Sequence, residues 1–188
     1  MSLTSLAERC LLELAVAQGH SVAGADARTY FDSVVNAVSV TEVYVDGLLG
    51  ALVNAEVAKE NQYVRALRED LGEKMFTTWS SRLGWLGRAF EVSIAGSDAQ
   101  QEMFTVIEVR NAVVHGHGKL TRRQSATLQG VLDLERAFWD VCKVNVSGGV
   151  LSATDRTAAV VASVSARFIR QLDAAAALKH VWLSGVVI

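Results

Sequence analysis

The 188-residue chain has 18 Lys and Arg against 20 Asp and Glu, so its formal net charge is −2. A net charge this close to zero excludes a global basic field that would recruit nucleic acid, so any anion site has to be local. The chain contains no proline, and 51% of its residues are hydrophobic, which favours long helices. Its length suits one sizeable core.

The two cysteines, Cys10 and Cys142, lie far apart within apolar helical patterns and outside any CxxC motif. We expect both to be reduced thiols in the core. The N-terminal stretch has no basic segment, and Glu8, Arg9 and Glu13 interrupt its apolar residues. That pattern fits neither a signal peptide nor a membrane span. The protein is therefore expected to be cytoplasmic and not bound to a membrane.

Apolar residues recur every three to four positions along most of the chain, which is the period of amphipathic helices. Two capping boxes, Ser97 with Gln100 and Thr121 with Gln124, mark helix starts. The predicted helices are about 3–18, 26–58, 61–93, 97–115, 121–142 and 154–179. A brief alternation around a Ser-Gly-Gly turn predicts a short hairpin-like insert near 143–151. The expected fold class is all-α, a helical bundle of about five to six helices with this insert.

The most unusual stretch of the chain is RNAVVHGHGK, which begins at Arg110. On a helix, Asn111 and His115 share a face and Arg110 lies on the neighbouring stripe. The three polar side chains are therefore expected to line one edge at the C-terminal end of a helix. Gly116 and Gly118 are predicted to end that helix and to leave space for a phosphate backbone.

The same region holds the clearest concentration of positive charge. Between Arg110 and Arg123 there are four Lys or Arg, two His and no Asp or Glu. We expect Lys119, Arg122 and Arg123 to bind an RNA backbone, with the last two in the first turn of the helix 121–142. The alternative for these two arginines is an ordinary solvated helix face.

This charge pattern suits a phosphodiester, because guanidinium is always charged and imidazole transfers protons near neutral pH. Cleaving RNA without a metal needs a base for the 2′-hydroxyl, a cation for the extra charge on phosphorus and an acid for the leaving 5′-oxygen. One Arg and one His do not comfortably fill three roles. A twofold dimer that brings two such edges together would supply two of each.

The string Arg110-Asn111-x-x-x-His115 at a helix end resembles the signature of the HEPN superfamily, an Arg followed by a polar residue, a short spacer and His. The Gly-rich stretch after the histidine, the next helix, the VNVSGGVLS turn and the final FIRQLDAA segment resemble the RiboL-PSP type of HEPN domain. The resemblance covers about residues 30–175. It implies a single helical domain over 1–188, with the helix 3–18 appended.

HEPN proteins are small helical bundles, and many are metal-independent ribonucleases that act as dimers in toxin–antitoxin, abortive-infection and RNA-processing systems. By resemblance, Arg110 and His115 are catalytic and Asn111 orients His115 or the phosphate. Glu42, in the string Glu42-x-Tyr44, matches an acidic residue beside an aromatic in that family. The implied protein is a homodimeric endoribonuclease without a cofactor or metal, which leaves 2′,3′-cyclic phosphate ends. Its implied partners are RNA and an antitoxin or another protein.

Simpler interpretations stay open for each of these residues. Arg110 and His115 can merely stabilise a helix C-terminus, and Glu42 can be an ordinary helix edge. His115 and His117 can ligate a metal, although no Cys, Asp or Glu lies near them in sequence. Aromatic side chains can stack on bases, but their helical spacing favours the core or a dimer interface for Trp79, Trp85, Phe90, Phe138 and Trp139.

Two other functions also stay open for the whole chain. One is a non-catalytic HEPN-like module that binds a nucleotide or a protein. The other is a purely structural bundle that dimerises through an apolar interface far from His115. The geometry of the dimer around His115 is the observation that separates the three.

Overall fold

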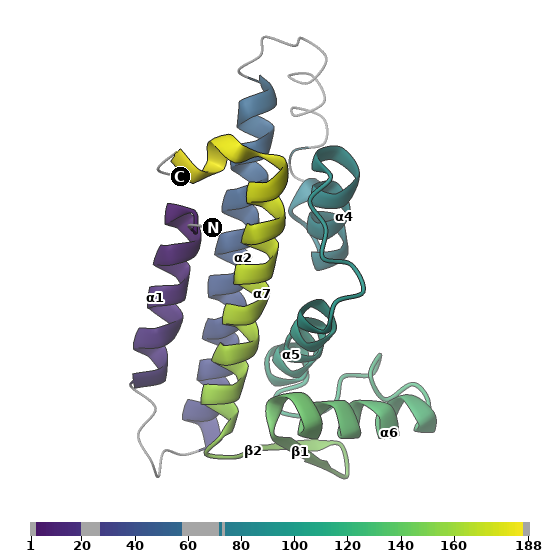
Figure 1. Cartoon of the computed structure of the whole chain (residues 1–188). Helices are drawn as coiled ribbons and strands as arrows, with labels where there is room; N and C mark the ends of the chain where they lie inside the picture. The colour runs from purple at the N-terminus through teal and green to yellow at the C-terminus, as the bar shows by residue number, and fades with distance from the viewer. Residues whose placement is uncertain (1–2, 20–26, 58–71, 73, 186–188) are drawn as a thin grey trace. The chain divides into compact units, whose positions relative to one another are not determined.

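A computed structural model of the chain describes residues 3–19, 27–57, 72 and 74–185. Within these residues the fold is an all-α helical bundle with one small two-stranded sheet, as the sequence predicts (Figure 1). The α-helices are α1 (Ser5–Gly19), α2 (Ala27–Val57), α4 (Trp79–Phe90), α5 (Asp98–His115), α6 (Leu128–Ala137) and α7 (Thr157–Lys179). A π-helix follows α6 at Phe138–Cys142, and a 3-10 helix follows α7 at Val181–Gly185.

The chain forms two compact units. The first contains Met1–Cys10, Thr41–Ala95 and Ile169–Ile188, and the second contains Leu11–Val40 and Gly96–Phe168. Helices α1, α2 and α7 contribute residues to both units. The expected single domain over 1–188 stays a prediction.

In the first unit, a buried carboxylate joins the start of α1 to α2 and α7. Asp173 is 1% exposed and accepts hydrogen bonds from the Thr4 backbone N–H (3.0 Å), the Thr4 hydroxyl (2.6 Å) and the Tyr44 hydroxyl (3.1 Å). Burial, with the nearby Asp173 charge, raises the pKa of Tyr44 well above its ordinary value. Three donors compensate the desolvation of the carboxylate, so this network fixes where α1 begins.

In the second unit, the same three long helices meet again. Leu14 of α1, Ala37 of α2 and Ala162 of α7 line one narrow gap between them. Helix α5 buries an apolar stripe that includes Met103 and Val106, and the Met103 sulfur accepts a hydrogen bond from a serine of α7. This stripe fixes the rotation of α5, and the polar side chains of its last two turns are therefore half-buried or exposed.

The predicted insert is a hairpin of β1 (Val144–Ser147) and β2 (Val150–Ala153), which reaches two residues beyond the expected end. The strands are antiparallel, with Val144 opposite Ala153. Gly148 and Gly149 have φ angles of 55° and 78°, as the two central residues of a type I′ turn require. The loop after α5 attaches to this hairpin, because Leu120 donates to the Gly149 carbonyl (2.8 Å) and Leu151 donates to the Gly118 carbonyl (2.9 Å).

The predicted start of the helix at Thr121 is wrong. Thr121 and Gln124 do exchange hydrogen bonds as a capping box, at 2.9 and 3.3 Å, but these bonds close only a turn. The Gln124 amide is held by α5, and α6 takes its own cap at Thr127, whose hydroxyl accepts from the Gly130 N–H (3.1 Å). The helix therefore begins at Leu128, and it changes to a π-helix from Phe138.

The predicted helix 61–93 lies partly outside the described residues. In the described part, a turn at 76–78 separates it from α4. Thr78 caps α4, because its hydroxyl accepts a hydrogen bond from the Ser81 N–H (3.0 Å). The sequence therefore predicted the helix type correctly but missed this break.

The two cysteines are free and buried, as expected. Burial raises the pKa of the Cys142 thiol to about 12. Among the described residues, the segment Arg28–Glu56 of α2 is long and apolar enough to cross a membrane, with a mean hydropathy of 1.2 in its most apolar window. Half of that window is buried, and core helices of soluble proteins satisfy the same criteria.

Candidate active site

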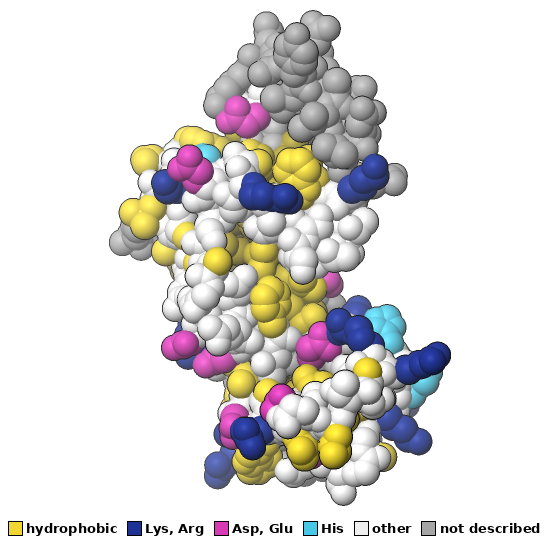
Figure 2. Space-filling model, turned by 90° about the vertical axis from the view of Figure 1, so that its right-hand side faces the viewer, with side chains coloured by type: hydrophobic (Ala, Val, Ile, Leu, Met, Phe, Trp, Pro, Cys, Tyr) yellow, Lys and Arg dark blue, Asp and Glu magenta, His cyan; other side chains and the backbone are white. Residues whose placement is uncertain are grey.

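The C-terminal end of α5 carries the RNAVVHGHGK stretch, and Figure 2 shows histidine side chains among Lys and Arg side chains along one edge of the face in view. The last helical bond runs from the Gly116 N–H to the Ala112 carbonyl (3.1 Å), and the Gly118 N–H closes the helix end by donating to the same carbonyl (3.1 Å). His117 and Gly118 follow in the left-handed conformation, with φ angles of 51° and 81°. This tight turn directs the chain from α5 into the loop that carries Lys119.

The two glycines of this turn differ in the space around them, which corrects the expectation that both open room for a phosphate. A Cβ atom at Gly116 would collide with the Lys119 carbonyl and lie 2.7 Å from the Ala112 carbonyl oxygen. Gly116 is therefore required by the close approach of the backbone. A Cβ atom at Gly118 would meet no other atom within 4 Å, so the space on its side is open.

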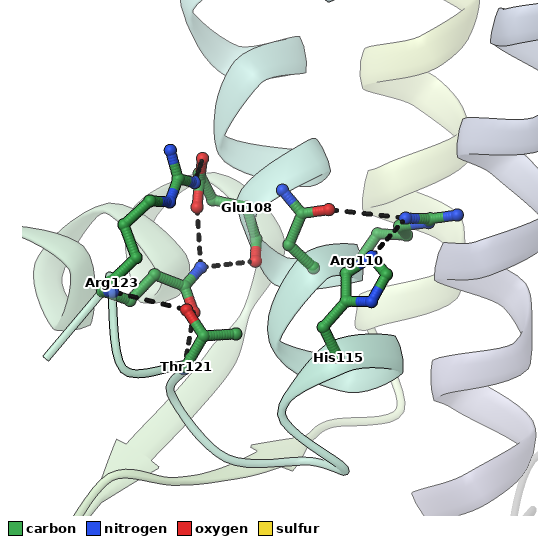
Figure 3. Close-up of polar contacts among 7 residues, drawn as sticks. Glu108, Arg110, His115, Thr121 and Arg123 are labelled. Atoms are coloured by element: carbon green, nitrogen blue, oxygen red, sulfur yellow. Dashed lines mark hydrogen bonds and ion pairs between the residues drawn. The ribbon is translucent and has the colours of Figure 1, made fainter. Parts of the chain in front are cut away.

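Arg110 contacts both Asn111 and His115, so the three side chains come together at one edge as the helical spacing predicts; Figure 3 shows the contact of Arg110 with His115. Nη1 of Arg110 lies 3.4 Å from Oδ1 of Asn111 and 3.2 Å from Nε2 of His115. Arginine only donates, so the second contact requires Nε2 to accept and places the imidazole proton on Nδ1. One guanidinium nitrogen thus touches both of the other predicted site residues.

Within the described residues, Arg110 contacts no carboxylate. Its Nε atom is buried without a hydrogen-bond partner, while His115 is exposed at the end of the helix. A buried guanidinium N–H that lacks an acceptor is unfavourable until one is supplied. The site therefore combines an uncompensated cation with an accessible imidazole, which is the pairing that an anionic ligand would complete.

The basic loop, residues 116–127 between α5 and α6, carries less uncompensated positive charge than its sequence suggests. Lys119 and Arg122 are exposed, but Nη2 of Arg123 lies 2.5 Å from Oε1 of Glu108, which stands two positions before Arg110 on α5. The two arginines also lie in a turn and not in the first turn of a helix. No acidic residue lies between 110 and 123, but Glu108, just before this stretch, compensates one of its arginines.

Sequence reasoning missed Glu108 and treated Gln124 only as a cap. Gln124 is 6% exposed, and its amide nitrogen donates to the Glu108 carbonyl (2.9 Å) and to Glu108 Oε2 (2.7 Å). Its amide oxygen meanwhile accepts from the Thr121 N–H. The only advance signal was the Thr121–Gln124 spacing, because Glu108 is separated by 15 residues or more from its partners and no local pattern joins them.

Glu42 belongs to the first unit, and its described partner there is a cation. Its carboxylate lies 3.6 Å from Arg82, which also donates to both carboxylate oxygens of Asp46 at 2.6 and 3.1 Å. The hydrogen bond to Asp46 raises the pKa of Arg82. Tyr44, the aromatic of the Glu42-x-Tyr44 string, is buried against Asp173. This geometry supports the helix-edge interpretation of Glu42, and its catalytic role stays a prediction.

The described residues contain no group of three or more His, Cys, Asp or Glu side chains that could hold a metal. His117 is exposed and turned into the left-handed region. Among the aromatic residues, Phe138 is fully buried in the core, whereas Trp139 is 46% exposed and lies under the Lys143 ammonium group. Core packing is thus confirmed for Phe138 only.

No family model, no curated protein and no solved structure matches this chain. The resemblance to HEPN proteins therefore stays a prediction from the sequence, carried mainly by residues 110–115.

Proposed function

We propose that this chain is a metal-independent endoribonuclease of the HEPN type, which acts as a homodimer through a composite Arg/His site. The observation that carries the proposal is the contact between Arg110 and His115 at the exposed end of α5, 3.2 Å from Nη1 to Nε2. It brings a permanent cation and a proton-transfer group to one point. Asn111 contacts the same guanidinium nitrogen and limits where it can move.

The proposed reaction begins when a phosphate of RNA takes the place of the imidazole as the acceptor of Arg110. This exchange releases Nε2 of His115, whose lone pair then removes the proton from the 2′-hydroxyl. The 2′-oxygen attacks phosphorus while Arg110 stabilises the added negative charge. The bond to the 5′-oxygen breaks, and the products are a 2′,3′-cyclic phosphate and a 5′-hydroxyl.

The leaving 5′-oxygen needs a proton that one His115 cannot supply while it acts as the base. A second copy of the chain, related by a twofold axis, would bring a second His115 as the acid and a second Arg110. The exposure of His115 supports this arrangement, because the imidazole is accessible from outside its own chain. The resemblance adds a toxin–antitoxin or other defence setting, with an antitoxin as a protein partner.

The test is cleavage of a mixed RNA pool by purified protein in EDTA. His115→Ala should reduce the cleavage rate by about 10²- to 10⁴-fold, the usual contribution of a general acid or base. His117→Ala is the matched control, because this histidine is also exposed, whereas the contact with Arg110 belongs to His115. Equal losses in the two variants, or no cleavage by the parent protein, would remove the proposal.

A non-catalytic RNA- or nucleotide-binding module is the second candidate. The observation in its favour is that Nε2 of His115 is already engaged by Arg110, so the base is not free in the resting site. This candidate predicts that the parent protein retains RNA without cutting it. Arg110→Ala would then weaken retention, and His115→Ala would change it little.

A further inference from the structure

The Glu108 carboxylate holds two residues of the basic loop through separate oxygens (Figure 3). Oε1 lies 2.5 Å from Nη2 of Arg123, and Oε2 accepts from the Gln124 amide at 2.7 Å. The Glu108 backbone carbonyl accepts a second bond from the same amide at 2.9 Å. Glu108 of α5 therefore holds the Gln124 part of the loop and pairs with one of the loop's arginines.

These two connections differ in strength. Gln124 is buried, bonded twice to Glu108 and tied to Thr121 by its amide oxygen, so its release would leave buried polar groups unpaired. The Arg123 side chain is 74% exposed and meets Glu108 through a single nitrogen. Exposed ion pairs of this kind contribute little to stability and exchange readily for another anion. The Arg123 contact is therefore the part that a ligand can displace.

The charge of the loop depends on this contact. Lys119 and Arg122 are exposed and have no carboxylate partner within the described residues, whereas Glu108 compensates Arg123. A phosphodiester that reaches the loop offers Arg123 the same kind of acceptor that Glu108 provides, two oxygens that share a negative charge. Phosphate and Glu108 therefore compete for one guanidinium.

We infer that Glu108 is an internal competitor of phosphate, which pairs with Arg123 in the free protein and gives it up when the loop binds an RNA backbone. Gln124 keeps the loop attached to α5 in both states. The inference rests on the proposed function for the identity of the ligand. It adds a regulatory contact that raises the threshold for polyanion binding beside the Arg110–His115 edge.

The first experiment is elution from immobilised heparin, a polyanion that requires no cleavage. Glu108→Gln keeps a side-chain oxygen that can accept from the Gln124 amide but removes the negative charge. This variant should therefore elute at a higher NaCl concentration than the parent protein. Glu13→Gln is the matched control, because Glu13 is exposed on α1 and the substitution changes the net charge equally. Equal elution of the two variants would overturn the inference.

The second experiment measures binding of a single-stranded RNA probe as a function of salt, with catalysis suppressed by His115→Ala in every variant. Because Arg123 contacts phosphate in both proteins, removing the competing carboxylate should raise RNA affinity by up to about fivefold at 0.1 M salt, the equivalent of an exposed ion pair, and should leave the log–log salt slope nearly unchanged. Glu108→Gln should show this gain, and Arg123→Gln added to it should remove the gain. A gain that survives the loss of Arg123 would overturn the inference.

A third experiment compares the RNA affinities of two single loop variants, Arg122→Gln and Arg123→Gln, and does not require Glu108→Gln to fold. Arg122→Gln should lower RNA affinity about fivefold at 0.1 M salt. Arg123→Gln should lower it less, because in the parent protein the contact of Arg123 with phosphate is offset by the loss of its ion pair with Glu108. Equal losses would contradict the inference. If the parent protein cuts no RNA, the proposed function fails, yet the heparin result still decides whether Glu108 competes for Arg123.

Discussion

Replacing Tyr44 by Phe tests the buried network that anchors the start of α1. The ring is fully buried, so Phe fills the same space and only the hydroxyl, 3.1 Å from Asp173, is lost. A hydrogen bond to a charged acceptor contributes about 1.5–3 kcal/mol. Thr4 still donates twice to the carboxylate, so we expect the free energy of unfolding to fall by about 1.5–2 kcal/mol.

Urea unfolding at pH 7, followed by circular dichroism, measures this loss, and Asp173→Ala is the comparison. Asp173→Ala leaves three buried donors without an acceptor and should cost roughly 3–5 kcal/mol. The pKa of Tyr44 is raised in the folded protein, so its contribution is complete below the ordinary value of 10.0 and declines as the pH rises above it. The gap between parent and Tyr44→Phe should therefore shrink above pH 10. Equal stability of the two proteins at pH 7, or a smaller loss in Asp173→Ala than in Tyr44→Phe, would refute this reasoning.

Gly116→Ala should destabilise the protein more than Gly118→Ala in urea unfolding, because a Cβ atom at 116 would collide with backbone atoms. At Gly118 the only cost is the left-handed φ angle, which is about 1 kcal/mol for alanine. A larger loss in Gly118→Ala would contradict this structure of the turn. Burial raises the pKa of Cys142 from its ordinary 9.0 to about 12, so its contribution to stability is complete below pH 9 and is lost as the pH approaches 12. Cys142→Ala should therefore remove about 2 kcal/mol of the stability loss between pH 7 and pH 10.5, and an unchanged pH profile would contradict the burial of this thiol. Thr127→Ala should lower the free energy of unfolding by about 1 kcal/mol, because Thr127 caps α6. An unchanged free energy of unfolding would contradict this cap and favour a helix that starts at Thr121.

Sequence periodicity sufficed for the all-α class and for most helices because burial repeats locally along the chain. The helix ending at His115 and the Gly148-Gly149 hairpin are examples, since each depends on residues within a few positions of one another. The start of α6 could not be predicted in this way. Thr121 and Gln124 do pair, but the Gln124 amide nitrogen donates to Glu108, which lies 16 residues earlier in the chain. The helix therefore begins later, at Leu128.

The same division applies to the candidate site. Arg110, Asn111 and His115 were predictable as a group because helical geometry alone places them on one edge. The pairing of Arg123 with Glu108 was not predictable, because it depends on how the loop after α5 folds back. The glycine at 116 was predicted as an opening, whereas the approach of the Lys119 carbonyl makes it a packing requirement.

The chemistry of RNA ends tests the central claim most directly. A labelled RNA is incubated in EDTA with the parent protein or with Arg110→Ala, and the 3′ ends of the fragments are identified. The proposed attack by the 2′-oxygen predicts 2′,3′-cyclic phosphate ends, formed about 10²- to 10³-fold more slowly by Arg110→Ala, in which the charge on phosphorus is no longer stabilised. Fragments with 3′-hydroxyl ends, or equal cutting by the two proteins, would contradict the assignment of Arg110 and His115 as the site of an endoribonuclease.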